Sequence, residues 1–185
     1  MTLDYAILGL LSWQPFSGYD LKKVFEESPV YYWSGNNNQI YRTLLDLHRD
    51  GLVTKEVIPQ ENLPARKVYR STPQGEALLR QWVLTIPELP QRKHAFLLQL
   101  GWADRLSPTE LDALLEQYQE EMQALAVIAR ARSTNNPHQP SRTTREALLW
   151  QAIGTNWVLF YENEVSWAHD LRTQLQSLET ANTGT

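Results

Sequence analysis

The polar side chains between Asn37 and Arg42 have types and spacing that suit contacts to the base edges of a nucleic-acid duplex. Asn and Gln can pair with adenine through two hydrogen bonds, and Arg can pair with guanine in the same way. Two further cations stand together at Arg66 and Lys67, where they could contact phosphates. We expect base or phosphate contacts within this set: Asn37, Asn38, Gln39, Tyr41, Arg42, Arg66 and Lys67.

Each of these residues also has a purely structural explanation. Asn is a favoured helix cap, although the run of three from Asn36 is more than one cap requires. Tyr41 stands beside Ile40, so its ring could belong to the core, and a phosphate contact through its hydroxyl is the alternative. Charges such as Arg66 and Lys67 also occur on solvated hairpin edges. A DNA-binding arrangement of the surrounding elements would favour the functional interpretation.

The first element that must position these side chains is a helix from Asn36 to Asp50. Ile40, Leu44 and Leu47 recur at helical spacing and define its apolar face, which leaves the polar residues on another face. Gly51 follows, where a left-handed helix cap is expected. The polar face of this helix would therefore be free to enter a major groove.

A hairpin is predicted after this helix. Its strands are Leu52–Ile58 and Arg66–Ser71, and Pro59–Ala65 is the predicted loop between them. The second strand opens with the basic pair, so the hairpin would carry positive charge to the backbone beside the groove.

Two short helices precede the polar helix, and a capping box at Ser17–Asp20 starts the second of them. Three helices followed by a hairpin are the order of a winged helix-turn-helix domain. Thr72 and Pro73 then open another helix. The predicted fold is mainly α: an α+β winged helix followed by an all-helical domain.

The second half of the chain predicts two long amphipathic helices. Capping boxes stand at Ser107–Glu110 and Thr143–Glu146, and the second helix is expected to run to about Leu178. Helices this long expose more apolar surface than one small domain can cover, so a second copy is the expected cover. The predicted dimer interface comprises Leu111, Leu115, Tyr118, Met122, Leu125, Trp157, Phe160, Trp167 and Leu171.

Two prolines in the segment from Ile86 to Pro90 mark the boundary between the halves. We therefore predict a winged helix-turn-helix DNA-binding domain over residues 1–86 and a helical dimerisation domain over residues 87–179. The polar residues 180–185 are expected to be a disordered tail.

Composition narrows the class of protein. The net charge of −4 does not indicate nucleic-acid binding, but residues 1–85 are balanced with nine Lys+Arg and nine Asp+Glu, so the acidity lies in the second half. There is no cysteine, and the histidines have no metal-ligand spacing, so no metal or cofactor is expected. Neither a nucleophile elbow nor a phosphate-binding glycine loop occurs, so no enzyme is predicted. No signal peptide or membrane span is recognised, which favours the cytoplasm.

The seven tryptophans have two interpretations. Trp157 and Trp167 fit the apolar stripe of the last helix and favour a dimer core, because large aromatic side chains dominate interfaces. Trp82, Trp102 and Trp150 form a candidate effector pocket, because flat aromatic ligands stack on such side chains.

Several motifs in order resemble the PadR family of transcriptional regulators. They are Leu3–Leu11, Gly18–Leu21, Ile40–Tyr41 with Gly51–Val53, and Arg66–Tyr69, followed by a long helical tail. The resemblance implies a dimeric DNA-binding repressor on an inverted-repeat operator, with a small aromatic ligand as its candidate release signal. The even charge of the first half also permits another class, a winged-helix protein-interaction module that does not read DNA. Retention on DNA at low salt separates the two classes.

Overall fold

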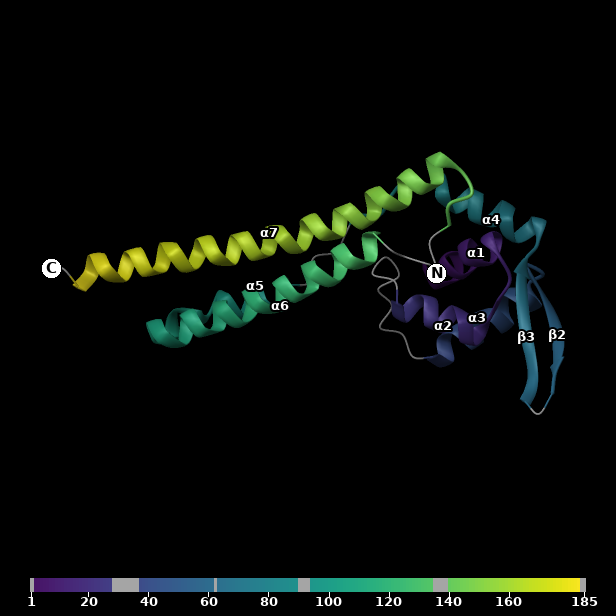
Figure 1. Cartoon of the computed structure of the whole chain (residues 1–185), viewed down its shortest axis with the longest axis horizontal. Helices are drawn as coiled ribbons and strands as arrows, with labels where there is room; N and C mark the ends of the chain where they lie inside the picture. The colour runs from purple at the N-terminus through teal and green to yellow at the C-terminus, as the bar shows by residue number, and fades with distance from the viewer. Residues whose placement is uncertain (1, 28–36, 62, 90–93, 135–139, 184–185) are drawn as a thin grey trace. The chain divides into compact units, whose positions relative to one another are not determined.

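The computed structural model describes residues 2–27, 37–61, 63–89, 94–134 and 140–183 of the 185-residue chain. Two compact units divide the chain, Met1–Glu88 and Leu89–Thr185 (Figure 1). The elements of the first unit are α1 (Thr2–Trp13), β1 (Phe16–Ser17), α2 (Gly18–Glu27), α3 (Asn37–Arg49), β2 (Val53–Gln60), β3 (Leu63–Ser71) and α4 (Pro73–Val83). Those of the second are α5 (Ala95–Leu100), the 3-10 turn η1 (Ala103–Arg105), α6 (Pro108–Thr134) and α7 (Thr144–Thr183). The predicted order of three helices, a hairpin and a further helix is confirmed.

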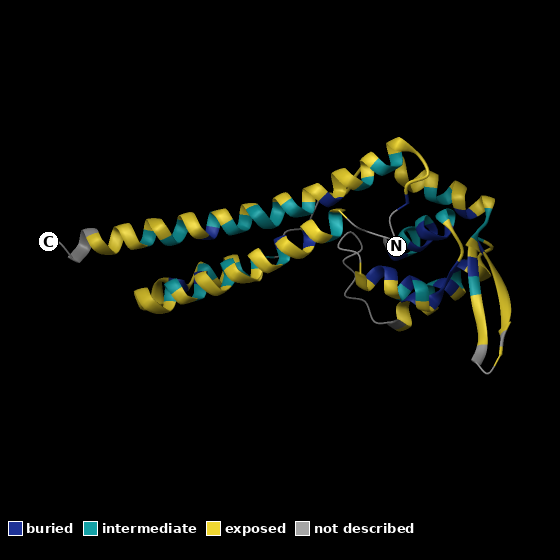
Figure 2. Cartoon of the chain, in the orientation of Figure 1, coloured by how far each residue is buried: buried dark blue, intermediate teal, exposed yellow. Residues whose placement is uncertain are grey.

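The core of the first unit forms where its helices meet the sheet. Ile40, Leu44 and Leu47 are buried, so the predicted apolar face of α3 is confirmed. They pack in one cluster with side chains of the other elements. Figure 2 colours the buried parts of these elements dark blue. The other buried members are Leu3, Ile7, Leu8, Leu10, Leu11, Phe16, Leu21, Val24, Phe25, Val53 and Tyr69. Burial of one face of α3 fixes its opposite face toward solvent.

The sheet is antiparallel with strand order β1-β3-β2, and β1 was not predicted. The predicted seven-residue loop between the hairpin strands is wrong, because β2 continues to Gln60 and β3 begins at Leu63. Pro59 falls within a register irregularity between Ile58 and Gln60 on the edge strand β2. Edge strands and bulges tolerate proline, since no ladder hydrogen bond is lost there. The hairpin is therefore longer than the two prolines suggested.

The starts of α4 and α6 follow the predicted caps. The hydroxyl of Thr72 accepts from the amide of Gly75 at 3.1 Å, and Pro73 occupies the first turn of α4. At α6 the Glu110 carboxylate accepts from the amide of Ser107 at 2.8 Å and from its hydroxyl at 2.6 Å. These bonds satisfy amide groups that a helix start leaves free.

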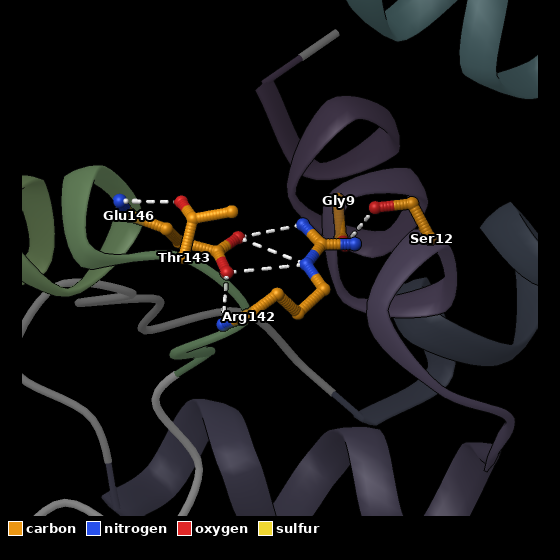
Figure 3. A network of polar contacts seen from close by, with 5 residues as sticks. All are labelled: Gly9, Ser12, Arg142, Thr143 and Glu146. Carbon is orange, nitrogen blue, oxygen red and sulfur yellow. Dashed lines mark hydrogen bonds and ion pairs between the residues drawn. The ribbon is translucent and has the colours of Figure 1, made fainter.

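The start of α7 differs from the predicted capping box. Thr143 caps as expected, because its hydroxyl accepts from the amide of Glu146 at 3.1 Å. The Glu146 carboxylate instead accepts from the amide of Arg142 at 2.7 Å and from its guanidinium at 2.6 Å (Figure 3). The Arg142 guanidinium holds the pKa of Glu146 below its ordinary value. Figure 3 also draws Ser12, whose hydroxyl donates to the carbonyl of Gly9 within α1.

The helices α6 and α7 pack against each other over most of the second unit (Figure 1). Leu115, a predicted interface residue, is 0% exposed in the single chain. It therefore belongs to the core of its own unit and offers no surface to a partner. Arg172 lies on α7 and donates two hydrogen bonds to the Asp112 carboxylate on α6, at 2.8 and 2.9 Å. The last helix continues to Thr183, although a disordered tail was expected from residue 180; residues 184–185 lie outside the described residues.

An aromatic cluster joins α5 to α6 and α7. The rings of Phe96 and Tyr118 are stacked with centroids 3.8 Å apart, and Trp167 meets both edge-on. The Tyr118 hydroxyl donates to the Glu164 carboxylate at 2.7 Å and lies 3.2 Å from Nε2 of His94. Nδ1 of His94 accepts from the amide of Leu97 at 3.4 Å, which places the hydrogen of the neutral ring on Nε2. Tyr118 and Trp167, both predicted at the dimer interface, thus pack within their own unit.

Candidate nucleic-acid interface

The exposed side chains of α3 lie opposite its buried ones. Asn38, Gln39 and Arg42 are exposed, whereas Ile40 between them is buried. Within the part of the chain that the structure describes, Arg42 has no ion-pair partner, so its guanidinium faces solvent. Asn37 begins the helix, and the structure describes its backbone only. The arrangement leaves the exposed amide of Gln39 and guanidinium of Arg42 available to an external partner.

Tyr41 both packs and remains accessible. Its side chain is 47% exposed, and its ring lies so close to Gly18 that a Cβ at that position would overlap it. Tyr41 is also a neighbour of Tyr69, whose pKa is raised by burial and by Tyr41. The ring therefore fixes α3 against the first residue of α2, and this close approach explains the glycine.

Arg66 is tied to α2. Its Nη2 donates to Oδ2 of Asp20 at 2.6 Å, and the same oxygen accepts from the amide of Ser17 at 2.8 Å and its hydroxyl at 2.7 Å. Partial burial raises the pKa of Asp20, but the bonds from Ser17 and Arg66 outweigh it and leave the pKa below its ordinary value. The capping box is visible in the sequence, but no local pattern pairs Arg66 with Asp20, which lies 46 residues earlier.

The hairpin carries further exposed cations. Lys67 is exposed and pairs in register with Val57, and Arg70 is exposed and pairs with Thr54. On α2, Lys22 lies 3.6 Å from Glu26, so part of its charge is balanced within the helix. Within the described part of this unit, Arg42, Lys67 and Arg70 are exposed without an ion-pair partner, whereas Arg66 is paired with Asp20. Their contact with phosphates stays a prediction.

The three tryptophans of the candidate effector pocket lie in both units. Trp82, in the first unit, is stacked on Tyr5 with ring centroids 4.6 Å apart and is 40% exposed. Trp102 and Trp150 belong to the second unit, where Trp102 is 66% exposed. Two grooves of about 340 and 680 Å³ lie along α6 and α7, and their linings do not include Trp102 or Trp150. The pocket stays a prediction.

The described residues contain no group of three His, Asp or Glu side chains that could hold a metal ion. None of the described helices has the length and apolarity needed to span a membrane.

A three-helix domain with an exposed polar third helix and a basic hairpin, followed by a helical unit, defines a winged-helix transcriptional regulator. Residues 7–81 match the transcriptional regulator PadR-like family, and residues 92–176 match the virulence activator alpha C-terminal family. The chain belongs to the PadR family, as its motifs predicted.

Known proteins are similar to this chain over most of its length. The negative transcriptional regulator PadR of Bacillus subtilis is 32% identical over 123 residues, which cover 66% of this chain and 68% of that protein. The crystal structure of Bacillus subtilis PadR in complex with operator DNA is similar with a TM-score of 0.82 at 26% identity, over 95% of this chain and 99% of that one. Its complex with p-coumaric acid is similar with a TM-score of 0.77 at 25% identity, over 95% and 99%.

Proposed function

We propose that this chain is a sequence-specific DNA-binding repressor that acts as a homodimer on an inverted-repeat operator. The observation that carries the proposal is the outward face of α3, where Gln39 and Arg42 are exposed while Ile40 and Leu44 anchor the helix in the core. A relative of the same fold binds operator DNA, which supports the same role here. The relatives are regulators, so we assign the chain no enzymatic activity.

The mechanism follows from the placement of the elements. The start of α3 would enter the major groove, where amide and guanidinium groups distinguish bases. The β2–β3 hairpin would lie along the flanking backbone, with Lys67 and Arg66 near phosphates. Two copies would engage half-sites about 34 Å apart and block a promoter. Such a target is consistent with the proposed cytoplasmic location.

The homodimer is supported by the outer surface of α6 and α7. Val127, Ile128, Leu148, Leu149 and Leu159 are each at least 45% exposed, which is unusual for so many large apolar side chains on one helix pair. A second copy would cover such a surface. Of the predicted interface residues, these are half-buried and keep area for a partner: Leu111, Met122, Leu125, Trp157, Phe160 and Leu171.

The repressor is proposed to be released by a small aromatic effector. A relative of the same fold binds p-coumaric acid, and Trp82, Trp102 and Trp150 are the candidate contacts in this chain. Binding would favour one arrangement of the two DNA-binding domains over another. Titration of the full chain with p-coumaric acid should quench tryptophan fluorescence and release DNA over the same concentration range. Quenching without release of DNA would contradict the proposal that the ligand regulates DNA binding.

The test of DNA reading compares Arg42 with a matched surface cation. A duplex selected from random sequences is titrated with the wild type, Arg42→Ala and Arg80→Ala; Arg80 is an exposed residue of α4. We expect Arg42→Ala to lose about tenfold or more in affinity and to relax base preference, and Arg80→Ala to change little. Retention of the wild type on DNA should fall steeply with salt. No retention at low salt would favour the protein-interaction module instead.

A further inference from the structure

The turn that starts α2 contacts both elements proposed to meet DNA. The Tyr41 ring of α3 packs on Gly18, and two residues further on the Asp20 carboxylate forms an ion pair with the Arg66 guanidinium of β3. Directly before Gly18, β1 pairs with β3 through Ser17 and Val68. A four-residue turn thus links the proposed reading helix to the basic start of β3.

The bonds to Asp20 fix one edge of the Arg66 guanidinium. Three donors converge on one carboxylate oxygen: Nη2 of Arg66 at 2.6 Å, and the hydroxyl and amide of Ser17, which form the capping box, at 2.7 and 2.8 Å. Arg66 uses Nη2 for this bond and its side chain remains 47% exposed, so the other N–H groups of the guanidinium can bond elsewhere. A fixed planar fork is suited to bind a phosphate at one position.

We propose that Asp20 is a positioning residue for DNA reading, which holds Arg66 so that its remaining N–H groups meet a phosphate in register with α3. The inference rests on the proposed function. Asp20 does not bind DNA itself, because its carboxylate and a phosphate repel each other. Its effect reaches DNA only through Arg66.

This role predicts an effect on specificity that is separate from affinity. When α3 is seated on its operator, the flanking phosphate has one place relative to the helix, and a pre-oriented Arg66 avoids the loss of side-chain freedom. On unrelated DNA the register varies, and a mobile Arg66 serves as well as a fixed one. Loss of a negative charge alone would strengthen binding to both kinds of DNA by the same factor.

The experiment measures the ratio of affinities for a selected duplex and an unrelated duplex of equal length, at one salt concentration. Asp20→Asn keeps an oxygen that can accept at the cap and removes the charge. We expect the ratio to fall about two- to tenfold per subunit. Glu26→Gln removes a charge from the same helix without touching Arg66, so its ratio should stay at the wild-type value.

The same substitution is then made in an Arg66→Ala background. Because Asp20 acts through Arg66, Asp20→Asn should leave the ratio of that variant unchanged. A ratio that does not fall in the wild-type background overturns the proposal, and so does an equal fall in both backgrounds. If Asp20→Asn fails to fold, Arg66→Lys replaces it, because an ammonium lacks the fork and should lower the ratio likewise; an unchanged ratio overturns the proposal. A wild type that binds no duplex would instead refute the proposed function.

Discussion

Removal of the Tyr118 hydroxyl tests whether the cluster beneath α5 stabilises the second unit. In Tyr118→Phe the ring keeps its stack on Phe96 at 3.8 Å, so no cavity forms, and only the polar contacts are lost. Burial and the neighbouring Glu164 hold the pKa of Tyr118 well above its ordinary value, so the hydroxyl is a protonated donor at neutral pH. The substitution therefore removes the hydrogen bond to the Glu164 carboxylate together with the contact to Nε2 of His94.

The magnitude follows from the partners that remain. The side chain of Glu164 is 14% exposed, and a hydrogen bond to a charged acceptor is worth about 1.5–3 kcal/mol. Nε2 of His94 lies 3.8 Å from the Glu164 carboxylate and can approach it, which offsets part of the loss. We expect the free energy of unfolding to fall by about 2 kcal/mol.

Urea unfolding of the full chain at neutral pH, followed by tryptophan fluorescence, measures this change, since Trp167 packs on the cluster. The control is Tyr19→Phe, a substitution of the same kind at a side chain that is 66% exposed. Two findings would refute the reasoning: a loss under about 0.5 kcal/mol for Tyr118→Phe, or an equal loss for the control. The small loss would mean that water replaces the hydroxyl at Glu164, and the equal loss would mean that the effect is not specific to this bond.

Two further predictions concern the start of α2. Gly18→Ala should destabilise the chain by about 1–3 kcal/mol in thermal unfolding and weaken DNA binding, because the added Cβ overlaps Tyr41. The control is Gly9→Ala in α1, which should not destabilise the chain because no atom lies within 4 Å of the added Cβ. Equal effects of the two substitutions would contradict the contact between Gly18 and Tyr41. The pKa of Asp20 is below its ordinary value of 3.8, so its stabilisation is complete above that pH and is lost as the pH falls further. Circular dichroism should therefore show a flatter loss of structure below about pH 4 for Asp20→Asn than for the wild type; parallel curves would show that Asp20 does not contribute.

Local patterns predicted most of the fold. The spacing of Ile40, Leu44 and Leu47 defined the buried face of α3, and the capping residues located the starts of α2, α4 and α6, because these signals act within one or two turns. The strand β1 has two residues and so carries no periodicity that a sequence could display. Pro59 suggested a loop because its tolerance on an edge strand depends on which strands pair.

The sequence predicted which residues belong to the candidate site, but it did not predict the contacts among them. The exposed positions on α3 follow from helical spacing, but Arg66 and Asp20 are 46 residues apart and meet only because β1 pairs with β3. Leu115 and Tyr118 fit the same apolar stripe as the other predicted interface residues, and periodicity alone does not tell which helix face meets its own chain and which meets a second one.

The seam between α6 and α7 contains the small residues Ala126, Ala129, Gly154 and Ala168, all buried, while larger apolar side chains such as Leu148 are 62% exposed. Where only these small residues meet, the helix pair buries little apolar area, so the surface that a second copy would cover would add stability beyond that of Leu115 and the aromatic cluster. The free energy of unfolding of the dimer would then depend on protein concentration and would fall by about 1.4 kcal/mol for each tenfold dilution. Cell growth without new synthesis would thus lower both the abundance and the folded fraction, and the regulated promoter would respond more steeply than dilution alone dictates.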